Sequence, residues 1–179
     1  MPRSMLRRFL PRIIGAFIAL VLVILAVGYL LPVGHSASRE HTYAATPASV
    51  FAAISTPSEF PRWRSDVRRV ELLPDKDGLP SFREVGGDGA ITYVVEESVP
   101  EGRFVTRIAD QSLPFGGSWT FEVKPAPDGT TLRITEDGEV YNPFFRFMSR
   151  FVFGHHRTID NYLADLDRRL GGQVAAGSP

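Results

Sequence analysis

The longest apolar run of the chain lies near its N-terminus, where Ile13 to Leu31 reads IIGAFIALVLVILAVGYLL and ends at Pro32. No charged residue stands between Arg12 and His35. A helix rising ~1.5 Å per residue over this run covers roughly the ~30 Å hydrocarbon core of a bilayer. The pattern therefore predicts a transmembrane helix over residues 13–32.

The charges on either side of this run predict its orientation. Residues 1–12 carry four arginines and no acid, whereas Arg39, next to Glu40, is the first basic side chain after His35. The positive-inside rule places the basic side in the cytoplasm. We therefore expect a single-pass protein of the plasma (inner) membrane, with residues 1–12 as a cytoplasmic tail and everything after Pro32 outside the cytoplasm.

A cleaved signal peptide is the alternative interpretation of the same segment. Its apolar region is normally ~7 to 15 residues long and ends in a small-x-small site. Here the run is longer, and LPVGHSAS offers a poor site, with Gly34 and Ser36 at the two key positions. The pattern favours an uncleaved anchor, whereas a soluble form beginning near Ala37 would indicate cleavage.

The segment after the anchor begins as one strand followed by two short helices. Residues 38–45 read as the strand, and TPASVFAAIST follows as a helix. Thr46 is a suitable N-cap, and Pro47 suits the first helical position because its missing N–H costs nothing there. PSEFPRW predicts a second brief helix or turn ended by Pro61, with Trp63 as a core anchor.

From Asp66 to Tyr141 the apolar residues recur with period two, interrupted by the turn signals PDKDG, GGDG, PEG and PDG. Short turns imply antiparallel neighbours, because parallel pairs need long crossovers. One face of the resulting sheet needs a cover. The predicted strands are Val67 to Leu73, Ser81 to Val85, Ala90 to Val99, Arg103 to Ala109, Ser118 to Lys124, and Thr131 to Val140.

The predicted cover is one long helix from Pro143 to Leu170, ended by Gly171 and Gly172. Residues 171–179 are expected to form a flexible tail. A helix against a curved antiparallel sheet gives an α+β domain over residues 38–170. The apolar positions of the helix recur at helical spacing and are Met148, Phe151, Val152, Ile159, Tyr162, Leu163, Leu166 and Leu170.

Two stretches carry a family resemblance: ATPASVFAAISTPSEFPRWRSDVRRVELL, and GGSWTFEVKPAPDGTTLRITEDGEV leading into the last helix. In this order of elements, residues 38–170 resemble the START-like superfamily, also called SRPBCC, which includes polyketide cyclases/dehydrases and lipid-transfer proteins. The resemblance implies a helix-grip fold of about seven strands, in which the sheet wraps the C-terminal helix and leaves a hydrophobic cavity. It does not imply one activity, because this fold hosts carriers, receptors and enzymes.

Composition removes several classes of function. The chain has 179 residues and no cysteine, so disulfides, thiolate metal sites and thiol nucleophiles are excluded. Its net charge is zero, but outside residues 1–12 there are 16 basic against 20 acidic residues. An acidic domain without a basic stripe is a poor nucleic-acid binder, because that affinity comes mainly from Lys and Arg.

His155 and Glu136 are the candidate catalytic pair. His155 falls within the apolar stripe of the predicted helix, and Glu136 shares a strand face with Leu132 and Ile134. An inward carboxylate is costly unless it is paired or hydrogen-bonded. The alternatives are a core histidine satisfied by a neighbour, and a strand-end carboxylate that reaches solvent. A bulge at Gly138 would reverse the parity.

Other candidates are binding residues rather than catalysts. A metal site would need His156 with Asp160 and further ligands, and no HExxH-type pattern supports one, so neither metal nor cofactor is expected. Tyr93 shares a face with Ile91 and Val95. The candidate ligand-binding residues are Tyr93, Trp119, Phe121, Glu136, Phe151, His155 and Tyr162.

Aromatic residues are in surplus before the last helix. YNPFFRFMSRFVF holds six aromatics in 13 residues, more than one helix face buries. Some of the four phenylalanines at 144, 145, 147 and 153 are therefore expected to be exposed, at a cavity opening or at a membrane surface with Arg146 and Arg150 near headgroups. Ordinary packing between the helix start and nearby loops is the alternative. The apolar loop SLPFGG, residues 112–117, is a candidate gate.

These features favour membrane-anchored binding of a hydrophobic small molecule or lipid in the helix-sheet cavity. An enzyme of the cyclase or dehydratase type, using His155 and Glu136, is the first alternative. It requires several polar groups to converge on one point, whereas a carrier cavity is nearly apolar. An interaction module for a membrane partner is the second alternative, and it predicts a collapsed cavity with exposed aromatics.

Overall fold

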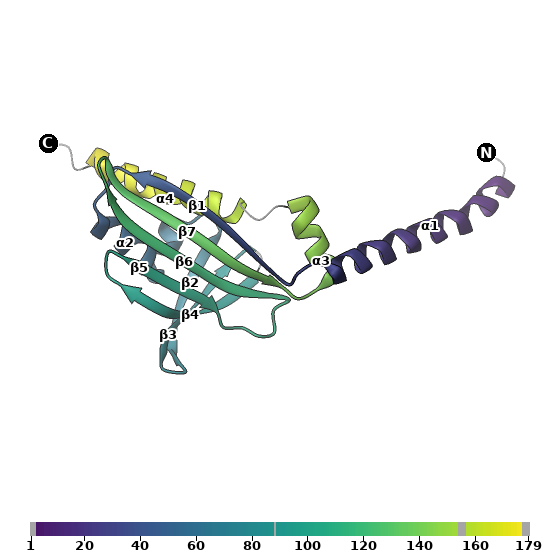
Figure 1. The fold of residues 1–179 in the computed structure, drawn as a ribbon, viewed down its shortest axis with the longest axis horizontal. Coiled ribbons are helices and arrows are strands. Elements are labelled where there is room, and N and C mark those ends of the chain that lie inside the picture. The colour runs from purple at the N-terminus through teal and green to yellow at the C-terminus, as the bar shows by residue number, and fades with distance from the viewer. Residues whose placement is uncertain (1–2, 88, 154–156, 177–179) are drawn as a thin grey trace.

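The computed structural model describes residues 3–87, 89–153 and 157–176. Within them, seven antiparallel strands form one curved sheet in the order β1-β7-β6-β5-β4-β3-β2. Helices cover the concave face of this sheet (Figure 1). Consecutive strands from β2 to β7 are neighbours joined by short turns, as the turn signals predict. The arrangement is the expected α+β helix-grip fold.

All six predicted meander strands are confirmed, most of them a few residues longer than the pattern indicates. The strand that precedes them, β1, begins at Gly34 rather than Ser38, so it follows the apolar helix after only three residues. The strands are β1 (Gly34–Tyr43), β2 (Val67–Lys76), β3 (Leu79–Gly86), β4 (Gly89–Val99), β5 (Arg103–Ile108), β6 (Phe115–Ala126) and β7 (Gly129–Val140).

The two short helices after β1 form as expected. In α2 (Pro47–Ser55), the Thr46 hydroxyl accepts a hydrogen bond from the Ser49 N–H at 3.2 Å, and Pro47 holds the first position. The 3₁₀ helix η1 (Pro57–Arg62) follows. Trp63 is buried in the core, with its ring edge-to-face against Phe60 at 5.8 Å between centroids.

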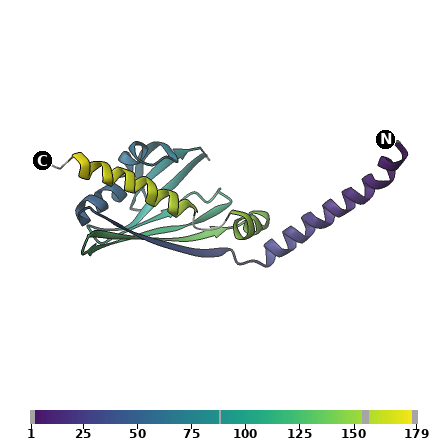
Figure 2. The same ribbon diagram turned by 90° about the horizontal axis from the view of Figure 1, so that it is seen from above.

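The predicted single helix from Pro143 to Leu170 is wrong, because this region contains separate helices. They are α3 (Pro143–Met148), the π-helical turn η2 (Ser149–Phe153) and α4 (Arg157–Ala176). α4 lies across the concave face of the sheet, whereas α3 lies beside the end of α1 (Arg3–Leu30) (Figures 1 and 2). α4 also continues beyond the predicted end at Gly171.

The division into separate helices also divides the predicted apolar stripe. Phe151 and Val152 are 61% and 58% exposed rather than packed on the sheet, since η2 continues directly from α3. The α4 part of the stripe is confirmed and packs into the core. Its buried members are Ile159, Tyr162, Leu163, Leu166 and Leu170.

The helix α1 projects away from the domain (Figures 1 and 2). Its segment Phe9–Leu30 is long and apolar enough to cross a membrane, and it is almost entirely unburied. A soluble core helix would be mostly buried, so α1 is a candidate membrane anchor or signal sequence.

Candidate functional site

A cavity of about 660 Å³ lies between α4 and the concave face of the sheet. It occupies one end of the sheet, and all seven strands contribute to its lining. In β1, β6 and β7 the lining residues are His35, 115–119 with 121, and 136–140. These residues start β1 and β6 and end β7, at the end where α1 enters and α3 leaves. Toward the other end of β7, Leu132 and Ile134 are fully buried and belong to the hydrophobic core, which fills the space under the sheet there.

The predicted inward face of β7 is confirmed. Glu136 follows Leu132 and Ile134 on the concave side, and the β6–β7 register runs from Phe115↔Val140 to Ala126↔Gly129 without a bulge. Glu136 therefore lines the cavity. The parity argument holds because Gly138 keeps the regular ladder.

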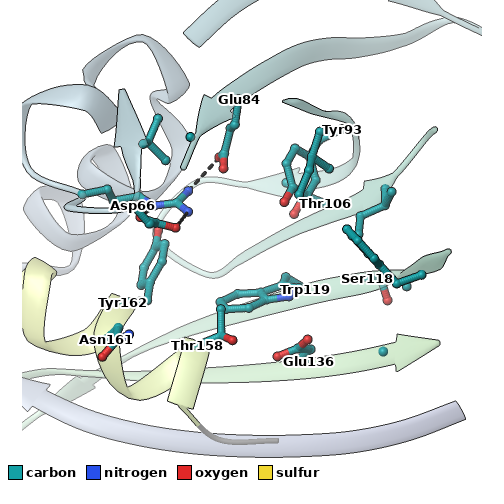
Figure 3. A pocket seen from close by; sticks show the side chains of 18 of the residues that line it. Asp66, Glu84, Tyr93, Thr106, Ser118, Trp119, Glu136, Thr158, Asn161 and Tyr162 are labelled. Carbon is teal, nitrogen blue, oxygen red and sulfur yellow. Dashed lines mark hydrogen bonds and ion pairs between the residues drawn. The ribbon is translucent and has the colours of Figure 1, made fainter. Parts of the chain in front are cut away.

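Glu136 has a specific polar partner. Trp119 is its cross-strand neighbour in β6, and both side chains lie on the cavity side of the sheet, where the indole N–H favours the charged carboxylate (Figure 3). Burial raises the pKa of Glu136 from 4.5 to about 7, and the Trp119 hydrogen bond limits that rise because it favours the charged form. Near neutral pH this carboxyl exists in both forms, so it is able to donate or accept a hydrogen bond.

A second polar group lies deeper in the cavity, where Arg64 and Glu84 form a salt bridge with 2.7 Å between Nη1 and Oε1 (Figure 3). Their side chains are only 11% and 10% exposed. Arg64 also pairs with Asp66 at 2.7 Å and lies over the ring of Tyr162. Burial raises the pKa of Glu84, and the Arg64 charge offsets part of that rise.

Tyrosines border this charged pair. Burial raises the pKa of both Tyr93 and Tyr162, so both phenols are neutral hydrogen-bonding groups at physiological pH. The Tyr162 hydroxyl oxygen is buried and has no hydrogen-bond partner within the described residues. A buried hydroxyl without a partner is costly, so a bound ligand or water that pairs with it is stabilised.

Five of the seven predicted ligand-binding residues line the cavity: Tyr93, Trp119, Phe121, Glu136 and Tyr162. The prediction for Phe151 is wrong, because its side chain points into solvent from η2. His155 lies outside the described residues, so its pairing with Glu136 stays a prediction.

The metal alternative involved His156, which also lies outside the described residues. Asp160, its suggested partner, forms a 3.2 Å salt bridge with Arg39 on the surface. Over residues 3–87, 89–153 and 157–176, no group of three or more histidine or acidic side chains is arranged to hold a metal ion.

Sequence reasoning missed the Arg64–Glu84 pair. Glu84 is two positions after Phe82 on β3, so the two side chains share one face of the sheet, and both are buried. The same parity argument identified Glu136 on β7. Arg64 stands beside Trp63, directly after a segment predicted as a brief helix or turn, where no strand alternation indicates which way its side chain points. In the structure it points into the protein, with a side chain only 11% exposed.

The family model described as polyketide cyclase / dehydrase and lipid transport matches residues 34–171. The chain belongs to this family. The match covers the whole sheet and most of α4, so all residues that line the cavity lie within the matched region. The helix α1 precedes it.

Solved structures share this family's START-like ligand-binding fold. A START superfamily protein from Mycobacterium smegmatis is 18% identical with a TM-score of 0.63, covering 78% of this chain and 99% of that one. The Zhui aromatase/cyclase from Streptomyces sp. R1128 is 15% identical with a TM-score of 0.66, covering 82% and 99%. At these identities the likeness concerns the fold. A search of curated protein sequences gives no significant match.

Proposed function

We propose that this protein binds a hydrophobic small molecule or lipid with one polar end in the cavity between α4 and the sheet. The observation that carries the proposal is an open cavity of about 660 Å³ whose aromatic walls surround a few fixed polar groups. Ligand sites in proteins commonly have volumes of ~300 to 1,000 Å³ and this mixture of lining groups. The open cavity also argues against the alternative that the domain is an interaction module for a membrane partner, because that alternative predicts a collapsed cavity.

We further propose that α1 is an uncleaved membrane anchor with its basic N-terminal side in the cytoplasm. Cleavage before Ala37 would remove three residues of β1, including the pairs Gly34↔Glu139 and Ser36↔Asp137. It would also place Ala37, a buried core residue, at a charged N-terminus. Only three residues separate the end of α1 from β1, the edge strand of the sheet. A cleavage site at this junction would therefore lie at or inside the folded domain.

Native mass spectrometry of the full-length protein, purified in detergent and incubated with a lipid extract, tests the binding. We expect a retained small molecule in the wild type. Thr106→Phe fills the cavity from β5, where Thr106 is a lining residue, and should abolish retention. Thr120→Phe makes the same change on β6 outside the cavity lining and should retain the ligand. Equal retention by the two variants, or none by the wild type, would reject the proposal.

Enzymatic activity of the dehydratase or cyclase type is the second candidate, and the polar groups of the cavity favour it more than the sequence did. Glu136, with a pKa of about 7, is suited to proton transfer at neutral pH. Its role would be to take a proton next to a carbonyl or to protonate a departing hydroxyl. Turnover of a β-hydroxy carbonyl compound that is lost in Glu136→Gln and retained in Asp128→Asn, a change at an exposed acid outside the cavity lining, would establish this activity.

A further inference from the structure

Exposed apolar side chains gather at one end of the domain. Among the described residues after α1, nine large hydrophobic side chains are exposed, and only Leu72 and Val99 lie elsewhere. The other seven, which we call the apolar collar, are Val33, Phe115, Tyr141, Phe144, Phe145, Phe151 and Val152. An exposed cluster of this kind marks an interaction surface rather than a random scatter.

Backbone hydrogen bonds hold the parts of the collar together. The Val140 N–H donates to the Val33 carbonyl at 2.9 Å, and the Tyr141 N–H donates to the Pro114 carbonyl at 2.9 Å. These bonds join the segment after α1, the start of β6 and the segment before α3. The collar therefore surrounds the point where α1 meets the sheet (Figures 1 and 2).

The collar is attached to α1 by direct contacts. Gly28 packs so closely on α3 that a Cβ at this position would collide with the carbonyl oxygen of Pro143. The Arg146 guanidinium donates to the carbonyls of Leu31 at 2.9 Å and Tyr141 at 3.0 Å. A cation that satisfies free carbonyls at a helix C-terminus stabilises that end. These contacts fix the direction in which α1 leaves the domain.

The length of α1 sets the depth of the collar. The apolar segment Phe9–Leu30 has 22 residues, which at ~1.5 Å per residue slightly exceeds the ~30 Å hydrocarbon core. Leu30 therefore lies at the bilayer surface when α1 spans it. Because Gly28 contacts Pro143, α3 begins at the same depth, among the headgroups. Arg150 is exposed in the adjoining turn, where a cation meets anionic headgroups.

We propose that the apolar collar docks onto the lipid surface of the membrane that α1 crosses, so that the open end of the cavity faces the bilayer. Phe115 belongs both to the collar and to the cavity lining, and the exposed lining residues Glu139 and Arg157 lie at the same end. A ligand would exchange directly with the outer layer of lipid. This inference rests on the proposed anchor and specifies where the ligand of the proposed function comes from.

Single-cysteine labelling tests the docking, and the cysteine-free chain makes it direct. Full-length Phe145→Cys and Phe151→Cys variants carry an environment-sensitive fluorophore in phosphatidylcholine/phosphatidylglycerol vesicles that contain nitroxide-labelled lipid. Leu72→Cys is the matched control, being an exposed apolar residue outside the collar, and Asp128→Cys marks the turn at the far end of the sheet. We expect several-fold stronger quenching at 145 and 151 than at 72 and 128.

The outcomes separate the docking from the rest of the proposed function. Co-flotation with vesicles and equal quenching at all four sites would mean an anchored domain held away from the lipid, which overturns the docking alone. Protection of 145 and 151 from aqueous iodide without quenching by lipid would mean that a second copy covers the collar, which also overturns it. Because no ligand is needed, docking stands even if mass spectrometry finds no bound molecule.

Discussion

Trp119 and Glu136 face each other across the β6–β7 ladder, and both side chains line the cavity, where the indole N–H favours the charged form of the carboxyl (Figure 3). The cavity thus contains a half-buried carboxyl group whose pKa is lowered by a neutral donor and, among the described residues, by no cation. Burial raises its pKa to about 7. This one relationship makes the protein's stability and its cavity chemistry sensitive to pH near neutrality.

Glu136→Gln should stabilise the protein at alkaline pH. Between 4.5 and about 7 the folded state holds this proton more tightly than the unfolded state, so the stability of the wild type falls as pH rises through that window. Gln keeps an acceptor for Trp119 without charge. Urea unfolding should give the variant an advantage of at most about 3 kcal/mol near pH 8, reduced by partial solvent exposure, and almost none near pH 4.

Asp137→Asn is the control for this experiment, because Asp137 is adjacent in sequence but exposed. It should leave the pH dependence of unfolding unchanged. If Glu136→Gln and Asp137→Asn change the unfolding free energy alike at every pH, the carboxyl at 136 is not the buried titrating group.

Trp119→Phe tests the hydrogen bond itself. The variant keeps an aromatic ring but loses the donor that favours the charged carboxylate, so the pKa of Glu136 should rise further. Carbon-detected NMR of the Glu136 carboxyl would show its titration midpoint move to higher pH. Trp63→Phe is the matched control, since the Trp63 indole N–H has no hydrogen-bond partner within the described part of the chain. An unchanged midpoint in Trp119→Phe would mean that the bond contributes nothing to the pKa.

Arg64→Met should strongly destabilise the fold. It leaves the Glu84 carboxylate buried beside β4 without its cation, and breaking a buried pair in this way costs about 3–5 kcal/mol. Adding Glu84→Gln should recover much of that loss, which a double-mutant cycle by urea unfolding would measure. Arg62→Met, which removes an exposed pair with Glu59, should cost less than about 1 kcal/mol. Similar losses in the two arginine variants would contradict the buried pair.

Strand parity explains why much of the site could be predicted from sequence. Once the turn signals define β7, Glu136 must share the side of Ile134, and the same reasoning placed Tyr93 and Trp119 inward. These predictions needed only local periodicity. The inward placement of Glu136 and Trp119 holds because the ladder between β6 and β7 is regular.

Tertiary contacts explain what could not be predicted. Arg64 and Glu84 are 20 positions apart, and only the folded sheet brings them together. The division into α3, η2 and α4 has a similar origin. Gly154 is the only glycine between Pro143 and Leu170, and periodicity alone continued the predicted helix through it from the stretch Pro143 to Phe153. Its aromatic surplus was a signal of another partner, but the contact of α3 with α1 joins segments more than 100 residues apart.

Gly28→Val should loosen the attachment between α1 and the collar. Its added side chain would collide with the Pro143 carbonyl, so α3 must move off α1. Gly15→Val makes the same change in the same helix, where nothing lies within 4 Å, and should have no effect. We expect faster amide hydrogen exchange in α3 for Gly28→Val only, together with weaker lipid quenching of a fluorophore at position 145 in vesicles. If both variants behave like the wild type in exchange and in quenching, the contact between Gly28 and Pro143 does not orient the domain, and the collar would need another means of reaching the lipid.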